Sequence, residues 1–319
     1  MNRMILGSTG LEVSRVALGT ADFGLEKIPE KQAFEQMDKY TSLGGNVIDT
    51  AEVYNNWVEG EKSRSEKIIG RWLEKTGIRS RVVLSTKGGH PLFESMTTPR
   101  LSNQEIRDDL SRSLDNLKTD RIDLYFLHRD DVRRPVEELI DLLEEQKQSG
   151  LIRNYGFSNW TLERAEQARS YAQKKGIKGF SVNQILWSPA RIRPETIGDK
   201  TLVPMSEVFH QYHAKTGMAA MAYTSQGKGY FSKRYQDREL SETLREQYSS
   251  WHNDEVYSAV AAYCDREHCD PSEVIVRWFM AQPFPALPII SASSLPQLEL
   301  LMSYERRALP PLGREMPLW

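Results

Sequence analysis

Cysteine and net charge are both scarce in this sequence. Its 319 residues include 2 cysteines, and the formal net charge at pH 7 is −2. Without an excess of positive charge, the chain has no strong electrostatic attraction for nucleic acid or for an anionic membrane. We therefore expect neither a nucleic acid nor a membrane among its partners.

The two cysteines, Cys264 and Cys269, stand beside His268 in the stretch CDREHCD. Cysteine and histidine ligands of zinc usually come in two closely spaced pairs, and no second pair follows this one. The stretch predicts two reduced thiols on a helix and no metal site.

Long apolar runs are absent as well. A membrane-spanning helix needs about 20 apolar residues, and the longest apolar runs here are far shorter. The N-terminus, MNRMILGSTG, lacks the apolar core of a secretory signal. We therefore expect a cytoplasmic protein.

Two features that mark other architectures are also missing. No GxGxxG follows the first predicted strand, where a Rossmann dinucleotide-binding unit requires it. No Pro-, Gly- or Ser-rich linker separates one part of the chain from another. We expect a single domain over residues 1–319, since barrels of parallel strands reach this size as one domain.

The chain is instead rich in short apolar runs of strand length. Their nearly continuous apolar character is typical of parallel strands that are covered on both faces. Eight such runs occur, at residues 16–20, 46–51, 81–87, 123–128, 152–158, 179–184, 218–223 and 286–290.

Charge-rich amphipathic stretches of helical length lie between the apolar runs. Residues 102–119 open with a capping box, Ser102 and Glu105, and residues 161–176 begin at the capping candidate Thr161 and end at a glycine. Alternation of strands and helices predicts an α/β fold with a parallel sheet. Eight repeats favour a closed (β/α)8 TIM barrel, with a doubly wound open sheet as the alternative.

Two stretches are longer than ordinary connections between a strand and a helix, and each follows the end of a predicted strand. In a barrel, this places them as long loops at the C-terminal face, where active sites are built. They span residues 185–202 and 227–253, and the second has the aromatic and charged mixture of a covering loop, with Tyr230, Phe231, Tyr235, Tyr248 and Trp251.

Polar residues close three successive predicted strands. Asp49 and Tyr54 follow the second strand, Lys87 ends the third and His128 ends the fourth. Parallel strands bring these four side chains to one rim of a barrel. An ordinary tyrosine has a pKa of about 10, which a neighbouring ammonium lowers. Such a tyrosine can give a proton to a carbonyl oxygen while a hydride reaches the carbon.

Each of these four residues also has a purely structural interpretation. Asp49 is a candidate helix or turn cap, and Tyr54 a candidate half-buried packing residue with a satisfied hydroxyl. Lys87 and His128 are candidates for solvated loop positions. Their common place at one rim is the observation that favours a catalytic site.

The contexts of these residues, NVIDTAEVY, LSTKGG and LYFLHRDD, resemble the catalytic tetrad of the aldo-keto reductases. The resemblance covers nearly the whole chain. LGSTGLEVSRVALGT (6–20) is similar to the N-terminal β-hairpin and first strand of that family, and GLIRNYGFSNW (150–160) to its fifth strand. The resemblance implies a TIM barrel with an N-terminal β-hairpin and an extended nicotinamide cofactor.

The resemblance also implies roles for individual residues. Tyr54 is the general acid in reduction, Lys87 lowers its pKa, Asp49 supports Lys87, and His128 orients the carbonyl. Ser158, Asn159 and Gln184 hold the nicotinamide carboxamide, and Tyr223 stacks on the ring. The complete set of implied cofactor-binding residues is Thr20, Asp49, Ser158, Asn159, Gln184, Tyr223, Thr224, Ser225, Gln226, Gly227, Lys228, Ser291, Ser293 and Gln297.

Three residues are candidates for contact with the substrate, and two of them, Phe23 and Trp57, match positions that usually line the substrate pocket in the family. Phe23 and Trp57 are compatible with that role and equally with ordinary packing of the barrel wall. Arg129 directly follows the tetrad histidine, and the alternative to substrate contact is a surface ion pair with Asp130 or Asp131.

The segment after the last strand departs from the family pattern. Residues 291–303 contain neither arginine nor lysine, although the 2′-phosphate of NADPH calls for such a cation. Both NADPH and NADH are therefore open as cofactors, and the resemblance favours NADPH.

The expected function is NAD(P)H-dependent reduction of aldehydes or ketones to alcohols, sugar-derived carbonyls included. The alternative is a catalytically weak redox sensor or adaptor subunit that binds nicotinamide. A metal-dependent hydrolase is excluded because no strand end carries a His-x-His or clustered carboxylate pattern. The expected partner is a small carbonyl substrate, and a homo-oligomer is compatible with the sequence.

Overall fold

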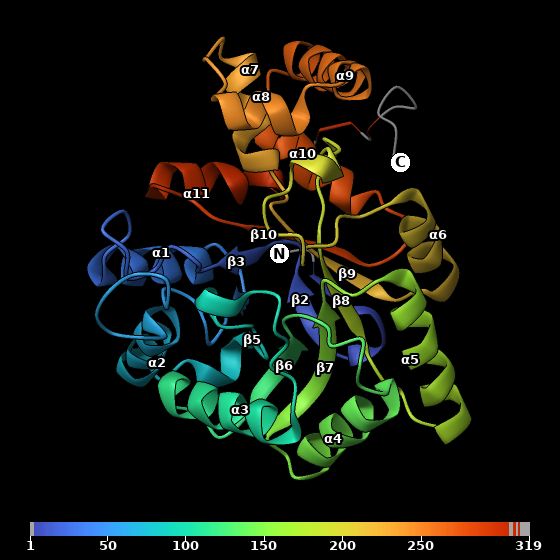
Figure 1. Ribbon diagram of the computed structural model, residues 1–319. Coiled ribbons are helices and arrows are strands. Elements are labelled where there is room, and N and C mark those ends of the chain that lie inside the picture. The colour runs from blue at the N-terminus through green and yellow to red at the C-terminus, as the bar shows by residue number, and fades with distance from the viewer. Residues whose placement is uncertain (1–2, 306–308, 311, 313–319) are drawn as a thin grey trace.

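The eight predicted strands form one closed barrel of parallel strands in the computed structural model, which describes residues 3–305, 309–310 and 312 (Figure 1). The barrel closes because β10 pairs with β9 on one side and with β3 on the other. The strands are β3 (Ala17–Gly19), β4 (Val47–Asp49), β5 (Val83–Gly88), β6 (Ile122–Leu127), β7 (Ile152–Ser158), β8 (Val182–Leu186), β9 (Ala219–Tyr223) and β10 (Ala286–Ile290). The predicted TIM barrel is confirmed, and the open sheet is wrong.

Helices surround the barrel and cover the outer faces of its strands (Figure 1). The Ser102–Glu105 capping box is present, and the Thr161 side chain caps its helix as predicted. The long helices are α1 (Glu30–Ser42), α2 (Arg64–Thr76), α3 (Asn103–Leu117), α4 (Val136–Gln148), α5 (Leu162–Lys175), α6 (Glu207–Thr216), α9 (Trp251–Glu267) and α10 (Pro271–Met280).

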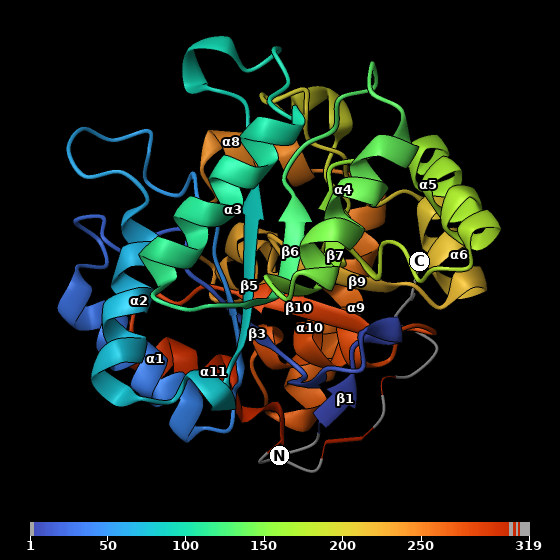
Figure 2. The same ribbon diagram turned by 90° about the horizontal axis from the view of Figure 1, so that it is seen from below.

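An antiparallel hairpin, β1 (Arg3–Ile5) and β2 (Glu12–Ser14), closes the amino-terminal end of the barrel. Leu6, Leu11 and Val13 from this segment belong to the same apolar cluster as the inward-facing strand residues. Figure 2 shows the hairpin at the end opposite to that toward which β5 and β6 point. The predicted N-terminal hairpin is therefore confirmed, and the carboxyl ends of the strands face the long connections.

The second long stretch is helical, contrary to the prediction of a covering loop. It contains α7 (Tyr230–Tyr235), α8 (Glu242–Tyr248) and the start of α9, which lie together beyond α10 in Figure 1. Tyr230, Phe231 and Tyr248 are buried in the main apolar core. These three side chains are buried between helices, as large aromatic residues commonly are, whereas Trp251 is 76% exposed.

The first long stretch, 185–202, agrees better with its prediction. Its first two residues complete β8, and the rest is irregular except for a 3₁₀ turn at Pro194–Thr196. Within the described residues, no helix has the length and apolar character needed to cross a membrane. The single domain over 1–319 stays a prediction, and its last residues lie outside the described part of the chain.

Candidate active site

The carboxylate of Asp49 and the ammonium of Lys87 meet inside the barrel mouth. They come from neighbouring strands, β4 and β5, and the Lys87 Nζ lies 2.8 Å from Asp49 Oδ2. The other Asp49 oxygen accepts hydrogen bonds from the Ser85 hydroxyl (2.7 Å) and the Gln184 amide (2.8 Å). Asp49 is thus held from three sides and keeps Lys87 in place.

All three donor positions of the Lys87 ammonium are used. It donates to Asp49, to the Thr50 carbonyl oxygen at 2.6 Å and to the Tyr54 hydroxyl at 3.1 Å. Burial disfavours the charged form, but Asp49 and Tyr54 outweigh this effect and hold the pKa of Lys87 above its ordinary value. Lys87 therefore remains a cation at neutral pH.

Tyr54 lies on the turn that follows β4, with its ring beside the Lys87 ammonium. The Nζ atom is 4.7 Å from the ring centroid. Because the Tyr54 oxygen accepts a hydrogen bond from Lys87, its own proton is free to be donated elsewhere. Tyr54 also lines the main cavity, so the donation can be directed toward a bound molecule.

His128 follows β6 and completes the group. Its ring centroid is 6.2 Å from that of Tyr54. Burial, together with the positive charge of Arg129, holds the pKa of His128 well below its ordinary value. Its Nδ1 atom is buried and has no hydrogen-bond partner among the described residues. The structure therefore brings the four predicted tetrad side chains together with a neutral imidazole.

A second imidazole, that of His90, lies against His128, and the sequence analysis missed it. The two ring centroids are 4.8 Å apart, and Phe93 packs against His90 with ring centroids 5.3 Å apart. Burial lowers the pKa of His90 to about 4. The available signal was its position three residues after Lys87, on the same connection from β5.

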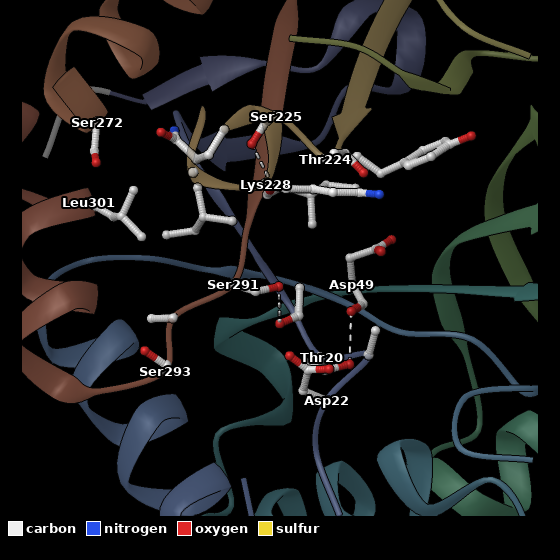
Figure 3. Close-up of a pocket in the computed structure, with 18 of the residues that line it drawn as sticks. Thr20, Asp22, Asp49, Thr224, Ser225, Lys228, Ser272, Ser291, Ser293 and Leu301 are labelled. Carbon is white, nitrogen blue, oxygen red and sulfur yellow. Dashed lines mark hydrogen bonds between the residues drawn. The ribbon is translucent and has the colours of Figure 1, made fainter. Parts of the chain in front are cut away.

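A cavity of about 890 Å³ runs from this group across the barrel mouth (Figure 3). Two of the predicted catalytic and cofactor-binding residues, Lys87 and Gly227, do not line this cavity. The cavity also has three cations that the sequence analysis did not assign, Lys27, Lys233 and Arg238. The predicted site residues that line it are Thr20, Asp49, Tyr54, His128, Arg129, Ser158, Asn159, Gln184, Tyr223, Thr224, Ser225, Gln226, Lys228, Ser291, Ser293 and Gln297.

The three residues predicted to hold a carboxamide form one hydrogen-bonded set. The Ser158 hydroxyl donates to the Gln184 backbone oxygen at 2.7 Å and accepts from the Asn159 amide at 3.0 Å. Asn159 also accepts from the Tyr223 hydroxyl at 2.6 Å. The Gln184 amide nitrogen binds Asp49, while its side-chain oxygen accepts nothing from the described residues. That oxygen is available to a ligand NH₂ group.

The segment after β9 adopts an unusual backbone. Thr224, Gly227 and Lys228 have φ values of 56°, 55° and 55°. A β-branched residue such as Thr224 seldom adopts a positive φ, and such conformations concentrate at ligand sites. The Ser225 hydroxyl anchors the turn to the Ile289 carbonyl oxygen on β10 at 2.7 Å (Figure 3). This turn sets Thr224 and Lys228 along the cavity wall.

The three predicted substrate residues lie in different settings. Phe23 is buried in the main core and does not line the cavity. Trp57 is 46% exposed and packs against Tyr54 and Phe93, with ring centroids 6.3 and 5.9 Å away. The geometry thus gives Phe23 a packing position and leaves Trp57 at the rim beside the tetrad.

Arg129 is buried, so the alternative of a surface ion pair with Asp130 or Asp131 is wrong. Its guanidinium pairs with Asp199 Oδ2 at 3.0 Å and donates to the Thr201 hydroxyl at 2.7 Å. Asp130 and Asp131 pair with other arginines. The neighbouring carboxylates are thus already occupied, and Arg129 pairs instead with a residue 70 positions away in the chain.

Metal chemistry finds no support in the described part of the chain. No group of three or more His, Cys, Asp or Glu side chains is arranged to hold a metal ion there. Cys264 and Cys269 are both buried, and neither is in a disulfide. Cys264 lies on α9 as predicted, but His268 ends that helix in a left-handed cap, so the prediction of two thiols on one helix is wrong for Cys269.

Comparison with known proteins shows that the chain is similar to aldo-keto reductases. The model of the Aldo/keto reductase family matches residues 15–311. The aldo-keto reductase ausK of Emericella nidulans is 31% identical over 245 residues, which are 73% of this chain and 57% of that protein. This chain therefore spans little more than half of the fungal relative.

Two further similarities extend over nearly the whole chain. Protein tas of Escherichia coli is 28% identical over an alignment of 323 positions, which covers 91% of this chain and 89% of that protein. Among solved structures, the holo form of an aldo-keto reductase from Bacillus halodurans has a TM-score of 0.72 and 25% identity, over 99% of this chain and 94% of that one.

Proposed function

The chain belongs to the aldo/keto reductase family, and from this premise we propose that it reduces aldehydes or ketones to alcohols with a nicotinamide cofactor. The observation that carries the proposal is the direction of one hydrogen bond. Lys87 donates to the Tyr54 oxygen, and Tyr54 is thereby left with a proton to give at the wall of the cavity.

The cavity fits an extended nicotinamide dinucleotide. At the tetrad end it offers the free side-chain oxygen of Gln184 to a carboxamide. Along its length it offers hydroxyl groups and the ammonium of Lys228, which suit phosphate oxygens. When bound there, the reduced cofactor supplies a hydride to the carbonyl carbon and is itself oxidised.

The protein residues supply the proton and the charge stabilisation in this proposal. Tyr54 donates its proton to the carbonyl oxygen as negative charge builds there. The Lys87 ammonium stabilises the tyrosinate that remains, and Asp49 keeps that ammonium in position. His128, a neutral imidazole, orients the carbonyl oxygen beside the Tyr54 hydroxyl through a hydrogen bond.

Replacement of Tyr54 by phenylalanine tests the proposal. We expect Tyr54→Phe to lower kcat by a factor on the order of 10³, because only the proton donor is removed, while affinity for the reduced cofactor stays close to that of the unmodified protein. The measurements are cofactor oxidation over a panel of aldehydes and ketones, and cofactor affinity from its fluorescence.

Tyr171→Phe is the matched control, since Tyr171 lies on α5 with its hydroxyl on the exposed Asp141. It removes one phenolic hydroxyl far from the cavity and should leave kcat unchanged. Retention of most of the activity in Tyr54→Phe would mean that another group is the acid. Tight cofactor binding without turnover on any carbonyl would instead favour the redox-sensor alternative.

A further inference from the structure

At the end of the cavity farthest from the tetrad, the segment after β10 is the expected source of a cation for a phosphate group. It supplies none. Residues 291–303 contain neither arginine nor lysine. Ser291 and Ser293 line this part of the cavity, and the Gln297 side-chain oxygen accepts hydrogen bonds from the Ser293 backbone and hydroxyl, at 2.8 and 2.9 Å. These groups offer a dianionic phosphate no opposite charge.

The opposite wall of the cavity supplies the cations that residues 291–303 lack. It comes from α7 and from the turn after it, which the chain brings to the cavity beside Ser272 at the start of α10. Figure 3 shows Ser272, Leu301 and Ser293 together at the end of the cavity away from Asp49. Two cations from the α7 segment, Lys233 and Arg238, line the same cavity.

Lys233 is held along the wall while its ammonium keeps bonding capacity. Its stem runs beside Gly229, where an added Cβ would lie 3.7 Å from the Lys233 Cε. The Nζ atom makes one long contact, 3.4 Å from the Lys228 carbonyl oxygen. It forms no ion pair with a described residue, so two of its three donor positions are available.

Arg238 lies in the turn after α7 and is hydrogen-bonded to the backbone of that helix. Its backbone N–H donates to the Lys233 carbonyl oxygen at 2.8 Å, which fixes the two residues relative to each other. Its exposed guanidinium makes one weak contact, 3.5 Å from the Gln236 side-chain oxygen, and it has no acidic partner in the described part of the chain. Lys233, on α7, and Arg238, in the turn after that helix, therefore both line the cavity with unused donors.

The charged residues near Lys233 and Arg238 do not cancel the positive charge of these two cations. Asp270 also lines the cavity, but one of its carboxylate oxygens caps α10 by accepting from the Ser272 N–H at 2.8 Å. Lys27 and Asp22, farther along the cavity, pair with each other at 3.2 Å. Arg234, which lies on α7 itself, is taken up by Asp254 and by the Tyr230 hydroxyl.

We propose that Lys233 and Arg238 form the site for the 2′-phosphate of NADPH, and that they make this chain select NADPH over NADH. The inference rests on the proposed binding of a nicotinamide cofactor in this cavity. A phosphate with nearly two negative charges gains charge-assisted hydrogen bonds from both cations, and the serine hydroxyls of the opposite wall add neutral ones. The cation comes from the connection after β9 instead of the one after β10.

Two nucleotide fragments test the proposal without turnover. Adenosine 2′,5′-bisphosphate and 5′-AMP differ only by the 2′-phosphate, and calorimetric titration of the full chain gives both affinities. We expect the unmodified protein to bind the bisphosphate at least tenfold more tightly, which corresponds to about 1.4 kcal/mol, because the 2′-phosphate gains charge-assisted hydrogen bonds. Raising the salt concentration should reduce this preference.

Single substitutions then locate the site. Lys233→Gln and Arg238→Gln should each weaken binding of the bisphosphate about tenfold and leave binding of 5′-AMP within about twofold of the unmodified value. Lys215→Gln, which removes an exposed cation from α6, is the matched control and should change neither affinity. Unchanged melting temperatures confirm that the variants fold.

The outcomes separate this inference from the proposed function. Equal affinity of the unmodified protein for the two fragments would overturn the phosphate site while leaving cofactor binding intact. An unaltered preference in both variants would show that the selecting cations lie elsewhere. If neither fragment binds, and neither NADPH nor NADH binds, the proposed function itself falls together with the inference.

Discussion

At the scale of single residues, the candidate active site is a set of groups whose protonation states are fixed by their surroundings. Lys87 is kept charged by Asp49 and Tyr54, whereas the imidazoles of His128 and His90 are kept neutral by burial and by the nearby Arg129. A neutral His128 can donate one hydrogen bond to a carbonyl oxygen. It does not act as a cationic acid, and that task falls to Tyr54.

This state of His128 predicts the pH dependence of reduction. An ordinary histidine gains a proton as the pH falls through 6.5, but a lowered pKa moves this change to more acidic conditions. We therefore expect kcat/KM, measured from pH 5 to 8, to show no inflection near pH 6.5. His252→Gln on α9 serves as the control and should reproduce the same profile. An inflection near 6.5 that disappears in His128→Gln would contradict the assignment.

At the scale of elements, one buried arginine fastens the irregular connection between β8 and α6 over the barrel mouth. Arg129, which follows β6, holds Asp199 and Thr201 of that connection. The Val203 N–H adds a hydrogen bond to Asn159 at 3.2 Å. Leu202, between these anchors, lines the cavity. The connection is therefore positioned by the ends of two other strands and forms part of the wall.

Removal of the Asp199 charge should loosen this connection. Asp199→Asn leaves the buried Arg129 without its counter-charge, and hydrogen bonds to charged groups contribute about 1.5–3 kcal/mol. We expect faster amide hydrogen exchange across residues 194–203 and a KM for the carbonyl that rises several-fold, with kcat changed less. Exchange is measured by mass spectrometry and KM by steady-state kinetics.

Glu195→Gln is the matched control, since it removes one negative charge from the same connection. Glu195 pairs with Arg193 at the surface, where both side chains are about half exposed and ion pairs contribute little. An equal effect of the two substitutions would show that charge alone, and not the buried anchor, governs the connection.

At the scale of the whole molecule, a carboxyl group buried between the barrel and two helices links pH to stability. Glu66 on α2 accepts hydrogen bonds from Thr86 on β5 at 2.6 Å and from Asn116 on α3 at 3.0 Å. Burial raises the pKa of Glu66 from 4.5 to about 7, against the opposite effect of these donors. The folded protein therefore holds a proton here that the unfolded chain releases.

The direction of the pH effect follows from this difference. Between pH 4.5 and about 7 the folded state binds more protons at Glu66 than the unfolded state, so its contribution to stability is complete below 4.5 and is lost as the pH rises to about 7. The loss is roughly 3 kcal/mol, since each pH unit of pKa difference corresponds to about 1.4 kcal/mol.

Glu66→Gln should remove this dependence. Urea unfolding of the variant and of the unmodified protein, measured from pH 4.5 to 8, gives the difference between their free energies of unfolding. We expect the unmodified protein to lose stability relative to the variant as the pH rises toward 7. Glu163→Gln at the exposed surface of α5 should show no such trend. A pH-independent difference for Glu66→Gln would place its pKa near the ordinary value.

The sequence by itself determined the barrel and the rim at which the tetrad meets. Eight nearly continuous apolar runs alternate with amphipathic stretches, and this local pattern is sufficient because parallel strands need covering helices. Asp49, Lys87 and His128 converge because each closes one of three successive strands, and parallel strands carry their carboxyl ends to one edge. Positions along the chain thus translate directly into positions in space.

Only the tertiary structure decided which distant groups become partners. The aromatic residues of 227–253 suggested a cover, but several of them fill the core between helices. Arg129 finds Asp199 and not its neighbour in sequence, and Lys233 reaches the cavity opposite the cation-poor segment 291–303. No local pattern records such pairings, because they depend on how long connections fold back over the barrel mouth and on which charges are buried there.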